Sequence, residues 1–291
     1  MGLFSDKKVT LVMSGGGAKG AYQIGMLKAF EEQCLEKKNL TLSGTSIGAM
    51  NSLIYAARDK EAIKELLDVF ADALNKEMAD PYVKERMDLL SCAKQDVIDG
   101  KVSFDEFIHS RKYYQMDNLY MIEAMKRICP DKLLADLEVP VTVCAYSLTK
   151  EKPVYFKLNG LPYDEQRLLT IASGSIPFLS PAIYYKNDFL LDGGCVPEIC
   201  KNPQPEDKIP VECVSDVPCD YFIISYLKPD DRVNLPKLPK DSKVIEIRPS
   251  RPLEKAKDTG TLDFSEESLR WREELGYKET MDILEGYLVC K

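Results

Sequence analysis

Two apolar segments, each followed by glycine and then by a helical pattern, constrain the fold of this chain more than any other feature. Residues 9–13 (VTLVM) are β-branched or apolar and stop just before three consecutive glycines, which is typical of a buried strand. Residues 20–34 then place Ile24, Leu27 and Phe30 on one side of a predicted helix. Residues 40–43 predict a second strand, and 49–57 return to a helical pattern. This order predicts an α/β sheet with helices on both faces.

The middle of the chain has a different character. Residues 61–137 show almost no strand pattern, and apolar side chains such as Leu66 and Phe70 follow helical spacing there. Strand character returns at 139–146, 154–156, 189–191, 221–227 and 244–247, and 265–288 predicts a closing helix. We therefore predict one domain over 1–291, with a three-layer α/β/α fold, a central and mostly parallel sheet, and a helical insertion at 58–138. The insertion is either a helical layer on the core or a mobile lid over a pocket.

The composition indicates a globular protein for which nucleic acid is a poor partner. Apolar residues make up 45% of the chain, which is enough for a large core, and the net charge of −8 opposes binding to phosphate backbones. The nine cysteines are an odd number without a Cys-x-x-Cys pair, and Cys195, Cys200, Cys213 and Cys219 lack the usual zinc spacing. We expect reduced thiols and no metal or other cofactor.

Targeting signals are weak. The first residues lack the apolar region of a signal peptide, and no run approaches the ~18 apolar residues of a membrane span. Gly2 suggests myristoylation, but Asp6 stands where that motif requires Ser or Thr. We expect a cytoplasmic protein. Lys and Arg outnumber Asp and Glu over 228–257, which offers a transient contact with lipid headgroups at a membrane surface, although a solvated surface is the simpler interpretation.

The pentapeptide Gly44-Thr45-Ser46-Ile47-Gly48 fits the Gly-x-Ser-x-Gly pattern of a nucleophile elbow. A predicted strand precedes it and a predicted helix follows it, as that mechanism requires. Glycines two residues to either side of the serine remove Cβ atoms that would clash in a sharp turn. The turn places the hydroxyl at a helix N-terminus, where partial positive charge favours an oxyanion. Ser46 is therefore a candidate nucleophile, and a plain glycine-rich turn is the alternative.

The glycine run at 15–17 predicts a loop that binds an anion. Glycines after a strand leave backbone N–H groups unshielded, so they can point at a phosphate or at a tetrahedral oxyanion. Gly15-x-Gly17-x-x-Gly20 also matches the dinucleotide fingerprint. That fingerprint needs an acidic residue at the end of the next strand, but this strand ends at the serine elbow. The Walker pattern fails too, because Gly20-Ala21 does not supply the Lys-Ser or Lys-Thr pair that it requires, so the oxyanion interpretation is favoured.

A serine hydroxyl needs a base, and histidine is the usual one. The only histidine, His109, lies inside the predicted insertion, whereas the common hydrolase order places the catalytic histidine late in the chain. A carboxylate is the remaining candidate. Asp192 follows an apolar strand and precedes Gly193 and Gly194, which allow close approach of another backbone. An aspartate of ordinary pKa ~3.9 is a weak base, and burial would raise its pKa and improve the match.

These motifs, in this order, resemble the patatin-like phospholipases. The resemblance lies in Gly15-Gly16-Gly17-Ala18-Lys19-Gly20, Gly44-Thr45-Ser46-Ile47-Gly48-Ala49 and Asp192-Gly193-Gly194, with a block of small residues and proline at 173–182 ahead of the last motif. It spans residues 9–194. The insertion and the final third match that family only in general character.

The resemblance implies a Ser46–Asp192 dyad in place of a triad, with no metal ion. Ser46 would attack an ester carbonyl to form an acyl-enzyme, and Asp192 would accept its proton and later activate water. Backbone N–H groups of Gly15, Gly16 and Gly17, together with that of Ile47, would hold the oxyanion. Lys19 would occupy the basic position of the family, where it steadies the loop, meets a phosphate or faces solvent.

The expected function is hydrolysis of an acyl ester in a lipid, of phospholipase A or lysophospholipase type, by a serine carboxylic-ester hydrolase. Two alternatives from other classes stay open at this point. One is a nucleotide-binding protein that uses the Gly15–Gly20 loop, and the other is a non-catalytic protein that binds lipid with the same fold.

Overall fold

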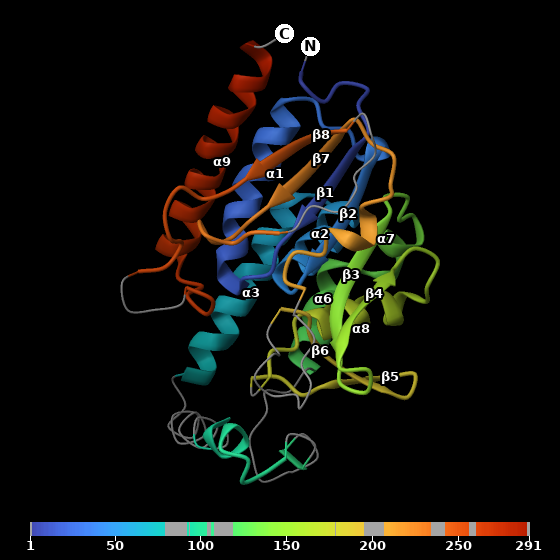
Figure 1. Ribbon diagram of the computed structural model, residues 1–291, viewed down its shortest axis with the longest axis vertical. Coiled ribbons are helices and arrows are strands. Elements are labelled where there is room, and N and C mark those ends of the chain that lie inside the picture. The colour runs from blue at the N-terminus through green and yellow to red at the C-terminus, as the bar shows by residue number, and fades with distance from the viewer. Residues whose placement is uncertain are drawn as a thin grey trace.

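A computed structural model describes residues 2–78, 92, 94–103, 106–107, 119–177, 179–194, 207–233, 242–255 and 260–289. Its centre is a sheet of eight strands in the order β5-β6-β3-β2-β1-β7-β8, with β4 paired to the second edge of β3 (Figure 1). The strands are β1 (Val9–Met13), β2 (Leu40–Thr45), β3 (Val141–Ser147), β4 (Lys152–Lys157), β5 (Ile183–Tyr185), β6 (Asp188–Asp192), β7 (Tyr221–Ser225) and β8 (Lys243–Ile247).

Helices flank this sheet, which confirms the predicted mostly parallel α/β fold. They are α1 (Ala21–Glu32), α2 (Ile47–Ala57), α3 (Lys60–Met78), α6 (Leu119–Ile128), α7 (Asp131–Ala135), α8 (Tyr163–Ser173) and α9 (Glu266–Val289), with short 3-10 turns at Gly17–Gly20, Lys37–Asn39 and Glu212–Val214. Helix α1 joins β1 to β2, and the long α9 lies along α1 (Figure 1). The sequence pattern did not predict α8 or the short edge strand β5.

The pairing pattern separates a parallel half from an antiparallel half. Strand β1 pairs in parallel with β2 and β7, β2 with β3, and β7 with β8. The antiparallel pairs are β3 with β4, β3 with β6, and β5 with β6. One edge of β3 changes partner along its length, because β2 pairs with Val141–Cys144 and β6 takes over at Ala145–Ser147. The carboxyl ends of β2 and β6 therefore approach each other head-on along β3.

Alternation along β1 distributes its side chains over two apolar clusters. Leu11 and Met13 belong to the main core beneath the helices, whereas Val12 points to the opposite face and packs with Val211 and Phe222. The segment that contains the Glu212–Val214 turn contributes to this second cluster. Both faces of the central strands are consequently buried, which explains why the sequence of β1 is continuously apolar.

The described part of the 58–138 region is helical, as the sequence predicts. Helix α3 packs against α1 and α2, and α6 packs against α3 and α8. The helical-layer interpretation fits these packed parts, while the lid hypothesis rests largely on residues 79–91 and 108–118, outside the described residues. Within the described chain, no helix is both long enough and apolar enough to cross a bilayer.

Candidate active site

Ser46 occupies the sharp turn between β2 and α2. Its backbone has φ 57° and ψ −126°, a conformation that side-chain-bearing residues rarely adopt and that the surrounding structure must impose. The residue is the N-cap of α2 and is only 7% exposed. Its side chain therefore lies at the positive end of a helix that consists almost entirely of buried residues.

The glycines of the pentapeptide allow this turn to pack against the sheet. A Cβ on Gly44 would lie 2.2 Å from the carbonyl oxygen of Gly48, and a Cβ on Gly48 would lie 2.1 Å from that of Met13. Gly20 likewise leaves no room for a side chain, because a Cβ there would lie 2.5 Å from Cγ1 of Ile47. These approaches bring the start of α2 against β1 and the glycine loop.

A hydroxyl from a distant helix secures the backbone of the elbow. Ser173, the last residue of α8, accepts a hydrogen bond of 2.8 Å from the N–H of Ser46 and donates one of 2.5 Å to the carbonyl of Cys144 on β3. Ser173 is fully buried, so water does not compete for either bond. The sequence did not single out Ser173 as a functional residue, although it opens the small-residue block.

Asp192 reaches the elbow because of the strand register. In the β3–β6 ladder it lies opposite Ala145, whereas Thr45, the residue before the serine, lies opposite Cys144. Asp192 is fully buried. Its Oδ1 accepts a hydrogen bond of 2.8 Å from the N–H of Gly194, which turns the carboxylate back over the glycine pair. The N–H of Asp192 itself donates to the carbonyl of Ser175.

Ser46 and Asp192 line one cavity of about 160 Å³, which we call the dyad cavity. The remaining wall comes from the glycine loop, from the segments on either side of β6 and from the last third of the chain: Gly15, Gly16, Gly17, Lys19, Ile176, Gly194, Lys208, Lys228 and Thr261. Residues that the sequence singled out separately thus meet in one place. Gly193 lies just behind, where an added Cβ would be 2.9 Å from the carbonyl oxygen of Cys144.

The glycine loop is held at two points by the last third of the chain. The Gly15 N–H donates to the carbonyl of Lys208 at 3.0 Å, and the Ala18 N–H donates to that of Thr261 at 2.8 Å. Gly17 has φ +57°, and a Cβ there would lie 2.2 Å from the Thr261 oxygen, so only glycine fits. Within the described chain, the N–H groups of Gly16 and Gly17 have no carbonyl partner.

Lys19 is 2% exposed, which excludes the solvent-facing alternative. Its ammonium group lies 3.5 Å from a carboxylate oxygen of Glu254. Burial lowers the pKa of Lys19, Glu254 partly offsets this effect, and the positive charges of Lys208 and Lys228 lower the pKa further. The charges of Lys208 and Lys228 therefore act on the ammonium group of Lys19.

A half-buried acid, Asp207, supports the loop behind the dyad cavity. The N–H of Asp207 donates to the carbonyl of Gly193, its own carbonyl accepts from the hydroxyl of Thr45, and its carboxylate accepts from the hydroxyl of Tyr155 at 2.5 Å. Burial raises the pKa of Asp207 above its usual range. Asp207 thus ties the strand before Ser46 to the turn after Asp192, a role that the sequence did not indicate.

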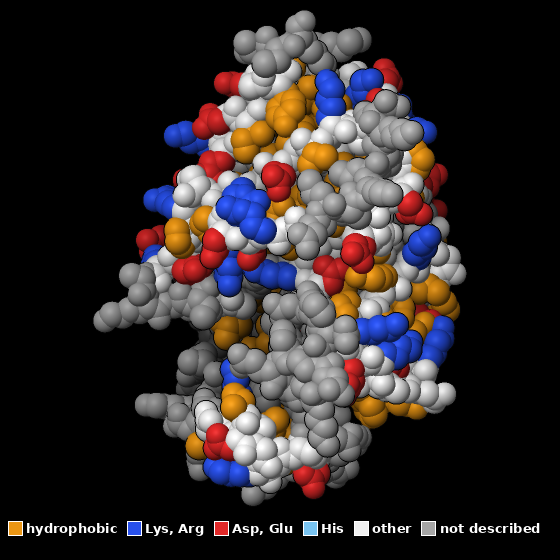
Figure 2. Space-filling view, viewed as in Figure 1, with side chains coloured by type: hydrophobic (Ala, Val, Ile, Leu, Met, Phe, Trp, Pro, Cys, Tyr) orange, Lys and Arg blue, Asp and Glu red, His pale blue; other side chains and the backbone are white. Residues whose placement is uncertain are grey.

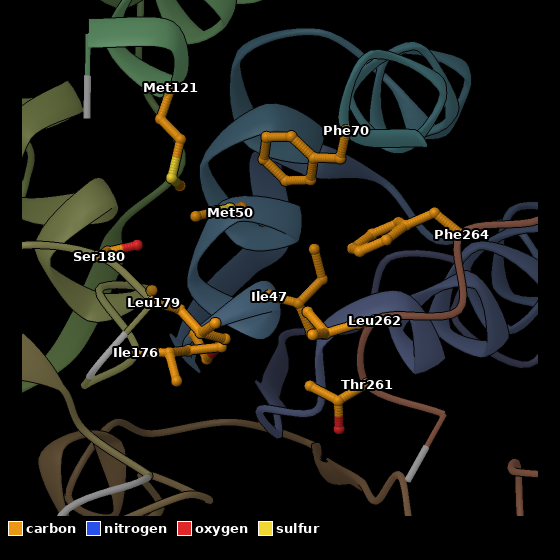
Figure 3. Close-up of a pocket in the computed structure, with 13 residues that line it drawn as sticks. Ile47, Met50, Phe70, Met121, Ile176, Leu179, Ser180, Thr261, Leu262 and Phe264 are labelled. Carbon is orange, nitrogen blue, oxygen red and sulfur yellow. The ribbon is translucent and has the colours of Figure 1, made fainter. Parts of the chain in front are cut away.

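A second, apolar cavity of about 120 Å³ opens beside Ser46 (Figure 3). Five of the segments that line it are apolar there: Ile47 and Met50 come from α2, Phe70 from α3, Met121 from α6, Ile176 and Leu179 from the small-residue block, and Leu262 and Phe264 from the segment before α9. The region 58–138 therefore contributes two walls of this cavity. Gly17, Ser46, Ile176 and Thr261 line both cavities, so the serine stands at their junction.

The predictions for His109 and for the clustered cysteines fall partly on residues outside the described chain. His109 and two of the clustered cysteines, Cys195 and Cys200, lie outside the described residues. Cys213 and Cys219 are free thiols. Among the described residues, no group of three or more His, Cys, Asp or Glu side chains could hold a metal ion.

Comparison with known proteins identifies the family. The family model for patatin-like phospholipases matches residues 11–200. This chain belongs to the patatin-like phospholipase family. The matched region contains the glycine loop, Ser46 and Asp192, whereas Lys208, Lys228 and Thr261 follow it.

Individual relatives of this patatin-like chain are distant or short. Lysophospholipase nte1 of Aspergillus terreus is 44% identical over 57 residues, which is 20% of this chain and 4% of that protein. The crystal structure of VipD from Legionella pneumophila has a TM-score of 0.46 and 18% identity, covering 96% of this chain and 67% of VipD. The ExoU chain of the ExoU–SpcU complex from Pseudomonas aeruginosa has a TM-score of 0.41 and 16% identity, covering 96% of this chain and 51% of that one.

Proposed function

We propose that this chain hydrolyses acyl esters of lipids, of the phospholipid or lysophospholipid class, through an acyl-enzyme on Ser46 with Asp192 as general base. The observation that carries the proposal is the dyad cavity, in which Ser46 and Asp192 meet beside the glycine loop and next to an apolar cavity. Family membership and the lysophospholipase match support a lipid hydrolase in the coarser sense.

The proposed reaction has two halves. Ser46 Oγ attacks the ester carbonyl carbon while Asp192 takes the hydroxyl proton, and collapse of the tetrahedral intermediate expels the alcohol, which leaves with that proton. Water then attacks the acyl-enzyme while Asp192 accepts the proton of the water, and Asp192 returns that proton to Ser46 Oγ as the bond between Oγ and the acyl carbon breaks and the fatty acid departs. The bond between Asp192 Oδ1 and the Gly194 N–H fixes the orientation of this carboxylate.

The oxyanion would be held by backbone donors. Of the expected group, the Gly15 N–H is already engaged by the Lys208 carbonyl, so we assign the role to the N–H groups of Gly16 and Gly17, with that of Ile47 at the helix N-terminus. The conformation of Gly17 is fixed by its contact with Thr261. Donors that are held in place before the reaction stabilise the transition state without reorganisation.

Labelling and turnover assays test this proposal together. A fluorophosphonate probe should label wild type, should label Asp192→Asn more slowly than wild type, and should not label Ser46→Ala. Asp192→Asn keeps the shape of the side chain but cannot accept the proton, so kcat should fall by roughly 10³-fold or more, in the upper range of general-base catalysis. Asp188→Asn is the matched control, because this aspartate lies on the same strand and is also buried but does not line the dyad cavity.

Five results would contradict the proposal, and the last two of them favour an alternative function. Full ester hydrolysis by Ser46→Ala would exclude Ser46 as the nucleophile. An equal fall in kcat in Asp192→Asn and Asp188→Asn would show that the loss is structural and not specific to the base. A large loss in His109→Ala would indicate a histidine base. No turnover of any lipid ester by labelled wild type would favour the non-catalytic lipid-binding alternative. Micromolar binding of a dinucleotide would favour the nucleotide-binding alternative, which requires an acidic residue that the end of β2 lacks.

A further inference from the structure

Three lysines line the same small cavity as the proposed dyad. Lys19 comes from the glycine loop, Lys208 from the segment after the Asp192 turn, and Lys228 from the segment that follows β7. The surface elsewhere mixes basic and acidic side chains, as Figure 2 shows for one face, and the chain as a whole carries a net charge of −8. The three lysines at the reaction centre therefore differ from the rest of the surface, where basic and acidic side chains are mixed.

Two of these lysines have carboxylate partners and one does not. Lys19 pairs with Glu254 at 3.5 Å, and Lys208 pairs with Asp231 at 2.8 Å, with both members of that pair four-fifths buried. Lys228 is exposed and makes no ion pair within the described part of the chain. Among the described residues that line the dyad cavity, Lys228 is thus the lysine whose ammonium group is available to an external anion.

The cavities on either side of Ser46 differ in chemistry. The apolar cavity is lined mostly by aliphatic, aromatic and methionine side chains, whereas the dyad cavity carries lysines and backbone N–H groups. An ester carbonyl at Ser46 would direct its acyl chain into the apolar cavity. The glycerol portion and its headgroup would then enter the cavity with the lysines.

We infer that Lys208 and Lys228 form a phosphate subsite, which makes the enzyme select phosphorylated lipids over neutral glycerides. This inference rests on the proposed ester hydrolysis at Ser46. Lys228 supplies the ammonium that contacts the phosphate, and Lys208, held by Asp231, lines the wall beside Gly15 and Gly194. Both lysines lie beyond the residues that match the family model.

Selectivity is best measured with soluble substrates that share one short acyl group. A monoacylglycerol, its phosphomonoester and its phosphocholine diester, all below their micelle concentration, separate the headgroup from membrane binding. Lys228→Gln should lower the ratio of kcat/KM for the phosphorylated esters to that for the neutral ester by about tenfold, and Lys228→Glu should lower it further. Lys208→Gln should act in the same direction. Lys132→Gln, an exposed lysine on α7, is the matched control and should keep the wild-type ratio.

Inorganic phosphate distinguishes a headgroup from a free anion. Added phosphate should inhibit hydrolysis of the phosphorylated esters competitively in wild type and more weakly in Lys228→Gln. Phosphate inhibition with an unchanged substrate ratio in both Lys228 variants would show a free-anion site and overturn the inference. An equal fall with neutral and phosphorylated substrates would also overturn it. Failure of the proposed function is recognised separately, because wild type would then hydrolyse none of the three esters.

Discussion

The hydroxyl of Ser173 should contribute both to the free energy of unfolding and to kcat, because it holds the backbone of the elbow at Ser46. Ser173→Ala deletes the acceptor of the Ser46 N–H, a bond of 2.8 Å between two buried residues. A buried donor that loses its partner costs about 1–3 kcal/mol. The Ser46 backbone, at φ 57°, itself holds strain on the order of 1–3 kcal/mol that nearby contacts must offset. We therefore expect the free energy of unfolding to fall by about 2 kcal/mol.

The rate should respond separately from the stability. Without this bond the elbow can relax toward an unstrained backbone, which moves Ser46 away from Asp192. A population shift that costs ~1.4 kcal/mol lowers the rate tenfold, so kcat should fall at least about tenfold while KM for a soluble ester changes little. Urea unfolding gives the first quantity, and initial rates on protein that circular dichroism shows to be folded give the second.

Ser175→Ala is the matched control for this prediction. Ser175 is equally buried and lies two residues away, and its hydroxyl donates to the carbonyl of Ile171. That carbonyl also accepts from the N–H of Gly174, so the control leaves no group unpaired. Ser175→Ala should keep kcat and lose under ~1 kcal/mol. Wild-type kcat and an unchanged urea midpoint in Ser173→Ala would refute the argument.

Two further changes test the cavity and its support. Met121→Trp places a larger side chain in the apolar cavity, so the optimum acyl length in a series of p-nitrophenyl esters should become shorter, and an unchanged optimum would place the acyl chain elsewhere. Burial raises the pKa of Asp207 above its ordinary 3.8, so the folded chain retains a proton that the unfolded chain releases, and this contribution to stability is lost as pH rises through the raised pKa. The free energy of unfolding of Asp207→Asn, measured with urea, should therefore rise relative to that of wild type as the pH is raised from pH 4. A difference in the free energy of unfolding that stays constant with pH would contradict the raised pKa.

Local patterns of the sequence predicted the elements that carry the site. The run at 9–13 indicated a buried strand, which occurs as β1, and the glycines after it indicated a loop, which occurs at Gly15–Gly17; that this loop binds an anion stays a prediction. Gly44 and Gly48 indicated a sharp turn; the clash of an added Cβ on Gly44 with the carbonyl of Gly48 is local to the turn, whereas the clash of one on Gly48 with the carbonyl of Met13 depends on how the turn packs against β1. The absence of a late histidine directed attention to Asp192.

The last third of the chain was harder to interpret. Residues 207–264 contribute Lys208, Lys228 and Thr261 to the dyad cavity and Phe264 to the apolar cavity. Isolated lysines and threonines in turns have no periodic pattern, and the usual expectation for them is a solvated surface. Their position became evident only from the hydrogen bonds that tie this segment to Gly15 and Ala18.

The sequence by itself determined which residues are chemically able to act, since nucleophile, carboxylate and glycines are recognisable from type and spacing. Only the tertiary structure decided that they meet. Ser46 and Asp192 come together because β6 runs antiparallel to β3 and occupies the edge that β2 vacates, and a shift of one residue in that register would turn the carboxylate to the other face. Register between distant strands depends on the packing of the whole sheet, which no local pattern encodes.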